Sequence, residues 1–163
     1  MPDSALEPAE RAFLQALGKL GVRFLIVGVS AASMQGARVA TEAVDLWLAD
    51  IGDPRIGEAA RSVGGIWVPG HFGMQPPTLG GKLGDRFDVV LTMSGLRDFE
   101  SEYAGAKVVE IDGIDVRLLP LDRIIESKRA ANRPKDRAAL PALEAALAVA
   151  QEAETAGHGD VGK

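Results

Sequence analysis

The stretch from Phe24 to Leu48 constrains the fold of this chain more than any other. It opens with four apolar residues, continues through Gly28 and a run of small residues, and ends in a second apolar segment at 43–48. A short apolar run that ends at glycine predicts a buried strand, and small residues after it let another molecule approach the backbone. We therefore predict a strand, a tight turn, a short helix and a second strand, which brings Asp45 toward the turn.

The remaining sequence alternates between helical and strand patterns, which predicts a mixed α/β (α+β) domain with helices packed around a central sheet. Helices are predicted at 5–20, 53–63, 97–103, 120–131 and 134–153, and strands at 22–27, 43–48, 66–68, 86–91, 107–111 and 114–118. Asp112-Gly113 predicts a tight hairpin between the last two strands. The segment 69–84, rich in proline and glycine, is predicted to be a long loop or lid.

Length and composition bound the class of protein. The 163 residues predict one domain over 1–156 and a disordered tail at 157–163. Apolar runs fall far short of the ~20 residues of a membrane span. The chain has no cysteine and no pattern of a secretion signal, so we expect a cytoplasmic protein. Its net charge of −5 is opposite to that of a general nucleic-acid binder.

Three features are candidates for one functional site. Small residues at Gly28-Val29-Ser30 can present backbone N–H groups to an anion, and Asp45 and Asp88 on separate strands are hard oxygen ligands for Mg²⁺. The segment 128–137 carries five cations, which neutralise phosphate. Each feature also has an ordinary structural explanation. Many turns between a strand and a helix contain glycine and serine for steric reasons alone, and a basic run is often simply a solvent-exposed face. The lone His71 is predicted to be structural or merely exposed.

The order of these motifs resembles the nucleotidyltransferase superfamily that shares the catalytic domain of DNA polymerase beta, and more closely its bacterial branch of minimal and toxin-type members. That family has a Gly-Ser turn after a strand, an Arg-x-x-Thr lead-in, an Asp-x-Asp strand, a later strand with a third carboxylate, and a C-terminal helix with a lysine. The matching segments here are Gly28-Val-Ser30, Arg38-Val-Ala-Thr41, Ala43-Val-Asp45, Arg86-Phe-Asp88 and the helix that contains Lys128.

The resemblance implies that Asp45 and Asp88 bind metal and act in catalysis. It also implies that five residues bind the nucleotide or its phosphates, namely Gly28, Ser30, Arg38, Thr41 and Lys128. In intact members three carboxylates hold two Mg²⁺ ions, a nucleoside monophosphate passes from a nucleoside triphosphate to an acceptor, and pyrophosphate leaves. The implied acceptor is a tRNA end, a protein hydroxyl or a small molecule, and a toxin-type member has a cognate antitoxin.

This sequence departs from the family pattern at two positions. Ala43 stands where the family has the first Asp of Asp-x-Asp, and Val29 stands where the turn has its middle glycine. An alanine methyl group does not bind Mg²⁺, and a branched side chain narrows the approach of a phosphate. A regular strand would point Glu42 to the face opposite Asp45, so Glu42 is not the expected substitute.

Two functions remain open from the sequence. The first is a degenerate nucleotidyltransferase, a pseudoenzyme that binds a nucleotide with a single weakly held Mg²⁺ at Asp45 and Asp88 and transfers it slowly or not at all. The second is a non-catalytic domain that keeps the fold and binds a protein partner through an exposed face around Trp47 or through the 69–84 loop.

Overall fold

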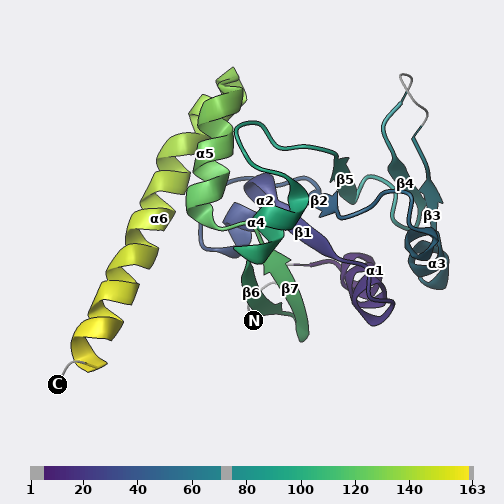
Figure 1. Ribbon diagram of the computed structural model, residues 1–163, viewed down its shortest axis with the longest axis horizontal. Helices are drawn as coiled ribbons and strands as arrows, with labels where there is room; N and C mark the ends of the chain where they lie inside the picture. Colours follow the sequence, from purple (N-terminus) through teal and green to yellow (C-terminus); the bar gives the residue numbers. More distant parts are fainter. Residues whose placement is uncertain (1–5, 71–74, 162–163) are drawn as a thin grey trace.

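A five-stranded mixed sheet lies at the centre of the molecule (Figure 1). A computed structural model describes residues 6–70 and 75–161 of the chain. The sheet has the order β5-β2-β1-β7-β6. Its strands are β1 (Phe24–Val27), β2 (Val44–Leu48), β5 (Phe87–Val90), β6 (Lys107–Ile111) and β7 (Ile114–Leu118). Strand β1 runs antiparallel to β2 and parallel to β7, and β2 runs parallel to β5, so the central sheet is mixed and the predicted α/β (α+β) class is confirmed.

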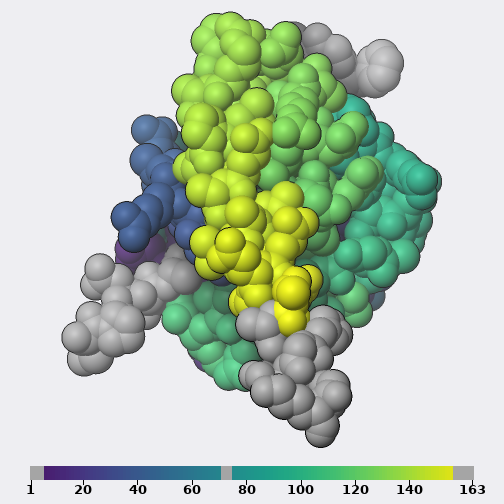
Figure 2. All heavy atoms as spheres, turned by 90° about the vertical axis from the view of Figure 1, so that its left-hand side faces the viewer, coloured from purple at the N-terminus to yellow at the C-terminus, as the bar shows by residue number. Residues whose placement is uncertain are grey.

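Six helices are described around this sheet: α1 (Pro8–Lys19), α2 (Gly28–Met34), α3 (Pro54–Ser62), α4 (Phe99–Ala104), α5 (Leu121–Ala131) and α6 (Pro134–Val161). Proline at the first helical position and the side chain of Asp53, which accepts a hydrogen bond from the backbone N–H of Arg55, start α3. Helices α5 and α6 lie side by side and cover one face of the molecule (Figure 2). All the predicted helices are present, and α6 continues past Ala153 to Val161.

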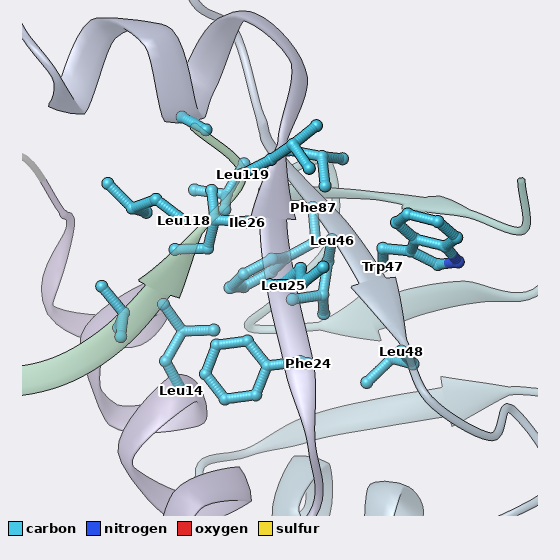
Figure 3. Close-up of a cluster of buried hydrophobic side chains, with 14 of the residues drawn as sticks. Leu14, Phe24, Leu25, Ile26, Leu46, Trp47, Leu48, Phe87, Leu118 and Leu119 are labelled. Atoms are coloured by element: carbon cyan, nitrogen blue, oxygen red, sulfur yellow. The ribbon is translucent and has the colours of Figure 1, made fainter. Parts of the chain in front are cut away.

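The register of the sheet separates an apolar face from a mixed face. Ile26 pairs with both Leu46 and Leu118, and Val44 pairs with Phe87, so these side chains share one face. Helix α1 covers it, with the ring of Phe13 edge-on to that of Phe87 at 5.2 Å. Figure 3 shows the buried side chains gathered along β1, β2 and β7. The opposite face carries the row Val27, Asp45 and Asp88, and it is the face from which a site can be built.

The prediction of an exposed face around Trp47 is wrong. Trp47 is 4% exposed, and its ring packs edge-on against that of Phe99 of α4, with the ring centroids 5.6 Å apart. Figure 3 labels Trp47 among the side chains of the core cluster. The strand alternation placed Trp47 on the correct face, but α4 covers that face. Trp47 therefore offers no surface to a protein partner.

The segment predicted to be a loop or lid at 69–84 contains a strand. Strand β4 (Thr78–Gly81) pairs antiparallel with β3 (Gly65–Val68) in a separate two-stranded sheet. The two glycines of β4 hid it in the sequence, because glycine is depleted in strands. His71 lies outside the described residues.

No helix within 6–70 or 75–161 combines the length and apolar character needed to cross a bilayer.

Candidate nucleotide-binding site

A cavity of about 1010 Å³ opens beside the ends of β1, β2 and β5 and reaches the start of α6. The sheet supplies Val27, Asp45, Asp88 and Val90 to its lining, and the loop that follows β5 supplies Thr92, Met93 and Ser94. The connection from α2 to β2 supplies a second wall, made of Arg38, Val39, Ala40, Glu42 and Ala43. Helix α5 and the start of α6 supply the third wall. The cavity thus joins segments that are up to about a hundred residues apart in the chain.

Asp45 and Asp88 are direct neighbours in the sheet. They pair in register across the parallel strands β2 and β5, and neighbouring strands lie about 4.8 Å apart. Registered residues of adjacent strands project from the same face, so both carboxylates line the cavity. Asp88 is exposed and Asp45 is half-buried. The structure therefore brings the two predicted metal ligands together.

Ser30 fixes the position of Asp45 from behind. Its hydroxyl donates to the carbonyl of Val27 at 2.9 Å and accepts from the backbone N–H of Asp45 at 2.9 Å. The same hydroxyl lies 3.3 Å from the Oδ2 atom of Asp45. Ser30 is 3% exposed and is not among the cavity-lining residues. Its hydroxyl therefore orients the carboxylate and ties α2 to β2, instead of facing the cavity as a phosphate ligand.

Gly28 leaves room for the same carboxylate. It has a φ of +62°, and a Cβ atom built on it would lie 2.6 Å from the Oδ2 atom of Asp45. A side chain here would strain the backbone and collide with the carboxyl group. Glycine at this position is therefore required by the packing of Asp45 as well as by the turn from β1 into α2.

The electrostatics of the carboxylate pair favour a bound cation. Burial raises the pKa of Asp45 above its ordinary value, and the negative charge of Asp88 raises it further. Hydrogen bonding to Ser30 and the positive charge of Lys128 oppose this rise in the pKa. A positive charge between the two carboxylates would relieve both their repulsion and the cost of burying Asp45.

On the wall opposite the sheet, two cationic side chains pair with one buried carboxylate. Asp136 of α6 is fully buried and accepts from Nζ of Lys128 at 3.2 Å and from Nε of Arg133 at 2.7 Å. It also accepts from the backbone N–H of Arg133 at 3.1 Å, as an acidic residue in the first turn of a helix commonly does. These contacts hold the pKa of Asp136 well below its usual range. Lys128 is thereby fixed at the cavity.

Most of the residues predicted for the site line this cavity. Gly28, Arg38, Asp45, Asp88 and Lys128 all do so. Thr41 is exposed and, like Ser30, is not among the lining residues.

Four charged residues line the cavity without having been assigned to it from the sequence: Glu42, Arg133, Lys135 and Asp136. The dense run of cations at 128–137 indicated Arg133 and Lys135 as a group, although it did not place them. Glu42 was expected to face away because a regular strand that includes residue 42 would point it to the face opposite Asp45. Strand β2 begins at Val44 instead, and Glu42 lies in the bend that precedes it.

The donor set fits one Mg²⁺ ion and does not fit two. A single Mg²⁺ is commonly held by one or two carboxylates together with substrate phosphates, and Asp45 and Asp88 provide such a pair. Ala43 lines the cavity beside them but carries no oxygen. Within 6–70 and 75–161 no three His, Cys, Asp or Glu side chains form a group that could hold a metal ion.

The fold is that of nucleotidyltransferases. No protein-family profile matches the sequence. A search of curated protein sequences also gave no match. Solved structures of the aminoglycoside nucleotidyltransferase ANT(2″)-Ia are similar. The crystal structure with adenylyl-2″-tobramycin has a TM-score of 0.56 and 17% identity, over 84% of this chain and 86% of that chain. The solution structure has a TM-score of 0.57 and 14% identity, over 93% of this chain and 94% of that chain.

Proposed function

We propose that the cavity binds a nucleoside triphosphate together with a single Mg²⁺ ion. The observation that carries this proposal is the registered pair of Asp45 and Asp88, which share a cavity with Lys128 on the facing helix. Carboxylates on one wall and a fixed cation on the other suit a metal-bound polyphosphate. The nucleotidyltransferase fold supports the same class of ligand.

In this proposal each residue has a role that its surroundings support. Asp45 and Asp88 would hold the metal, and Ser30 would keep Asp45 oriented by its hydrogen bonds. Lys128, held by Asp136, would contact a phosphate oxygen. Arg38 would reach the phosphates from the loop that precedes β2. When bound, Mg²⁺ would neutralise phosphate charge and polarise the phosphoryl group.

Transfer of the nucleotidyl group is proposed to be slow or absent. In a two-metal mechanism one ion activates the attacking hydroxyl, and that ion needs ligands of its own. By the family resemblance, Ala43 stands at the position of such a ligand. The half-buried Val29 also lines the cavity and adds bulk beside Gly28. We therefore propose that this protein is a nucleotide-binding pseudoenzyme with the nucleotidyltransferase fold.

If transfer occurs, the acceptor is proposed to be a small molecule. ANT(2″)-Ia has been crystallised with adenylyl-2″-tobramycin, a small molecule that carries an adenylyl group. A tRNA end and a protein hydroxyl are the other acceptor classes that the family resemblance leaves open. A bacterial, cytoplasmic toxin–antitoxin role with a cognate antitoxin remains a proposal from the family resemblance alone.

Titration calorimetry with ATP, CTP, GTP and UTP tests the binding step. We expect binding in Mg²⁺ for at least one nucleotide. Asp88→Asn should weaken this binding by at least about tenfold, because it removes one of two metal ligands. Asp115→Asn, which removes an exposed carboxylate from β7, is the matched control and should bind as the wild type does. The proposal fails if no nucleotide binds at high micromolar concentration, or if Asp88→Asn binds normally.

A further inference from the structure

Four cationic side chains line the cavity from separate segments of the chain. Arg38 comes from the loop before β2, Lys128 from α5, and Arg133 and Lys135 from the junction between α5 and α6. A bound anion would therefore meet positive charge from two walls. A polyphosphate has oxygens spaced along its length, which suits such a distributed set of donors.

Two of the four cationic side chains are held in ion pairs, and the other two are not. Lys128 and Arg133 share the buried carboxylate of Asp136. Arg38 and Lys135 are exposed and form no ion pair within the described residues. Because Arg38 and Lys135 are long and unrestrained, they can close on an anion without breaking an existing ion pair. Their full charge is available to the ligand.

The uncharged part of the cavity offers contact area with little power to distinguish one base from another. Within the described lining, the start of α6 and the last residue of α5 contribute the methyl groups of Ala131, Ala138, Ala139 and Ala142. The polar uncharged side chains of the described lining are the hydroxyls of Thr92, Ser94 and Ser127. A hydroxyl both donates and accepts, so it can pair with the edge of any base.

We propose that this site recognises the polyphosphate of its ligand and does not select the base. The inference rests on the proposed function and narrows it, because it assigns the binding energy to Arg38, Lys128 and Lys135 acting on phosphate oxygens. The alanine wall accepts adenine, guanine, cytosine or uracil alike. Inorganic tripolyphosphate, which has no base, is then a ligand of the same cavity.

Calorimetry of the full chain in Mg²⁺ with the four nucleoside triphosphates and with tripolyphosphate tests this inference. The four dissociation constants should agree within about threefold, and tripolyphosphate should bind within about tenfold of them and compete with ATP. A preference of more than about thirtyfold for one base overturns the inference and leaves the proposed function intact, as does binding of nucleotides without tripolyphosphate. Failure of all five ligands to bind overturns both.

Variants of the unrestrained cations separate phosphate recognition from base recognition. Arg38→Ala and Lys135→Ala should each weaken all five ligands by about tenfold or more, in equal proportion, because each removes a charge-assisted contact. Arg129→Ala is the matched control, since it removes a cation of α5 that pairs with Glu144 outside the cavity. A change in the order of base preference in Lys135→Ala, or unaltered affinity in both variants, contradicts the inference.

Discussion

At the scale of single residues, the half-buried carboxyl of Asp45 lowers the stability of the folded protein at neutral pH. Its carboxyl is half-buried beside Asp88, and both burial and that neighbouring charge raise its pKa. The folded state therefore holds the proton of Asp45 more tightly than the unfolded state does. Stability from this group is fully present below its unfolded pKa and is lost as the pH rises through the raised value. At neutral pH the ionised group lowers stability, which a bound cation would restore.

Replacing Asp45 by asparagine should therefore stabilise the protein at neutral pH. An asparagine oxygen can still accept from Ser30, whereas the buried charge is gone. We expect a melting temperature at pH 7 above that of the wild type, with a smaller difference at pH 4, measured by calorimetric scans. Binding of Mg²⁺ and nucleotide should be lost in the same variant. Asp115→Asn should change neither property, and a difference that grows toward pH 4 would contradict the assigned pKa direction.

The second residue-scale prediction concerns Ala43. Ala43 lies in the bend before β2 and lines the same cavity as Asp45 and Asp88, so a longer side chain there is placed to add an oxygen to the cavity. Ala43→Asp combined with Val29→Gly should introduce or increase pyrophosphate release from a nucleoside triphosphate by at least about tenfold. Ala43→Asn with Val29→Gly is the control of similar shape without the charge. Equal inertness of the Asp and Asn variants with a broad set of acceptors would refute the assigned role of position 43.

At the scale of secondary structure, Asp136 joins α5 to α6. Asp136→Ala should lower the free energy of unfolding by about 3 kcal/mol, because Lys128 and Arg133 lose the fully buried carboxylate that they share. Glu144→Ala breaks an exposed ion pair between the same two helices and should cost less than about 1 kcal/mol. Urea denaturation of both variants measures the difference. Equal effects would show that Asp136 does not hold the helices together.

The lowered pKa of Asp136 gives this contact a pH dependence. Its contribution to stability is fully present above the ordinary value of 3.8 and is lost as the pH falls through the lowered value. The wild type should therefore lose stability more steeply than Asp136→Asn does as the pH falls below the ordinary pKa of 3.8. Denaturation midpoints at a series of acidic pH values measure the two slopes. Parallel slopes would contradict the ion pairing seen at Asp136.

Elements that depend on local chemistry were predictable from the sequence, and those that depend on a distant partner were not. Asp112 and Gly113 both have positive φ, as the two-residue turn of a tight hairpin requires, and the predicted bounds of β6 and β7 are confirmed. Strand β4 escaped prediction because its pairing with β3 compensates for two glycines. Trp47 was assigned to the correct face of β2, but the sequence gives no sign that Phe99 covers it.

At the scale of the whole molecule, the wall of the site that the sheet builds was predictable from the sequence. The wall that α5 and α6 build was not, because it depends on long-range packing. Strand alternation places Asp45 and Asp88 toward one face, and their register in adjacent strands brings them together. The contribution of α5 and α6 depends on how that helical pair packs across the open edge of the cavity. A buried aspartate in a basic segment looks like an ordinary helix cap in the sequence, so the role of Asp136 becomes evident only when its three-dimensional partners are known.

The long helix α6 divides into a half that builds the molecule and a half that extends beyond it (Figure 1). Leu143 is fully buried, whereas Val149 is 66% exposed and residues 151–155 are all exposed. Truncation after Glu152 should therefore change the free energy of unfolding by less than about 1 kcal/mol and leave nucleotide affinity unaltered. Leu143→Ala should cost about 2–5 kcal/mol, because it leaves a cavity where α6 meets the core. Urea denaturation and calorimetry of both variants test this division, which fails if the truncation destabilises the protein as much as Leu143→Ala.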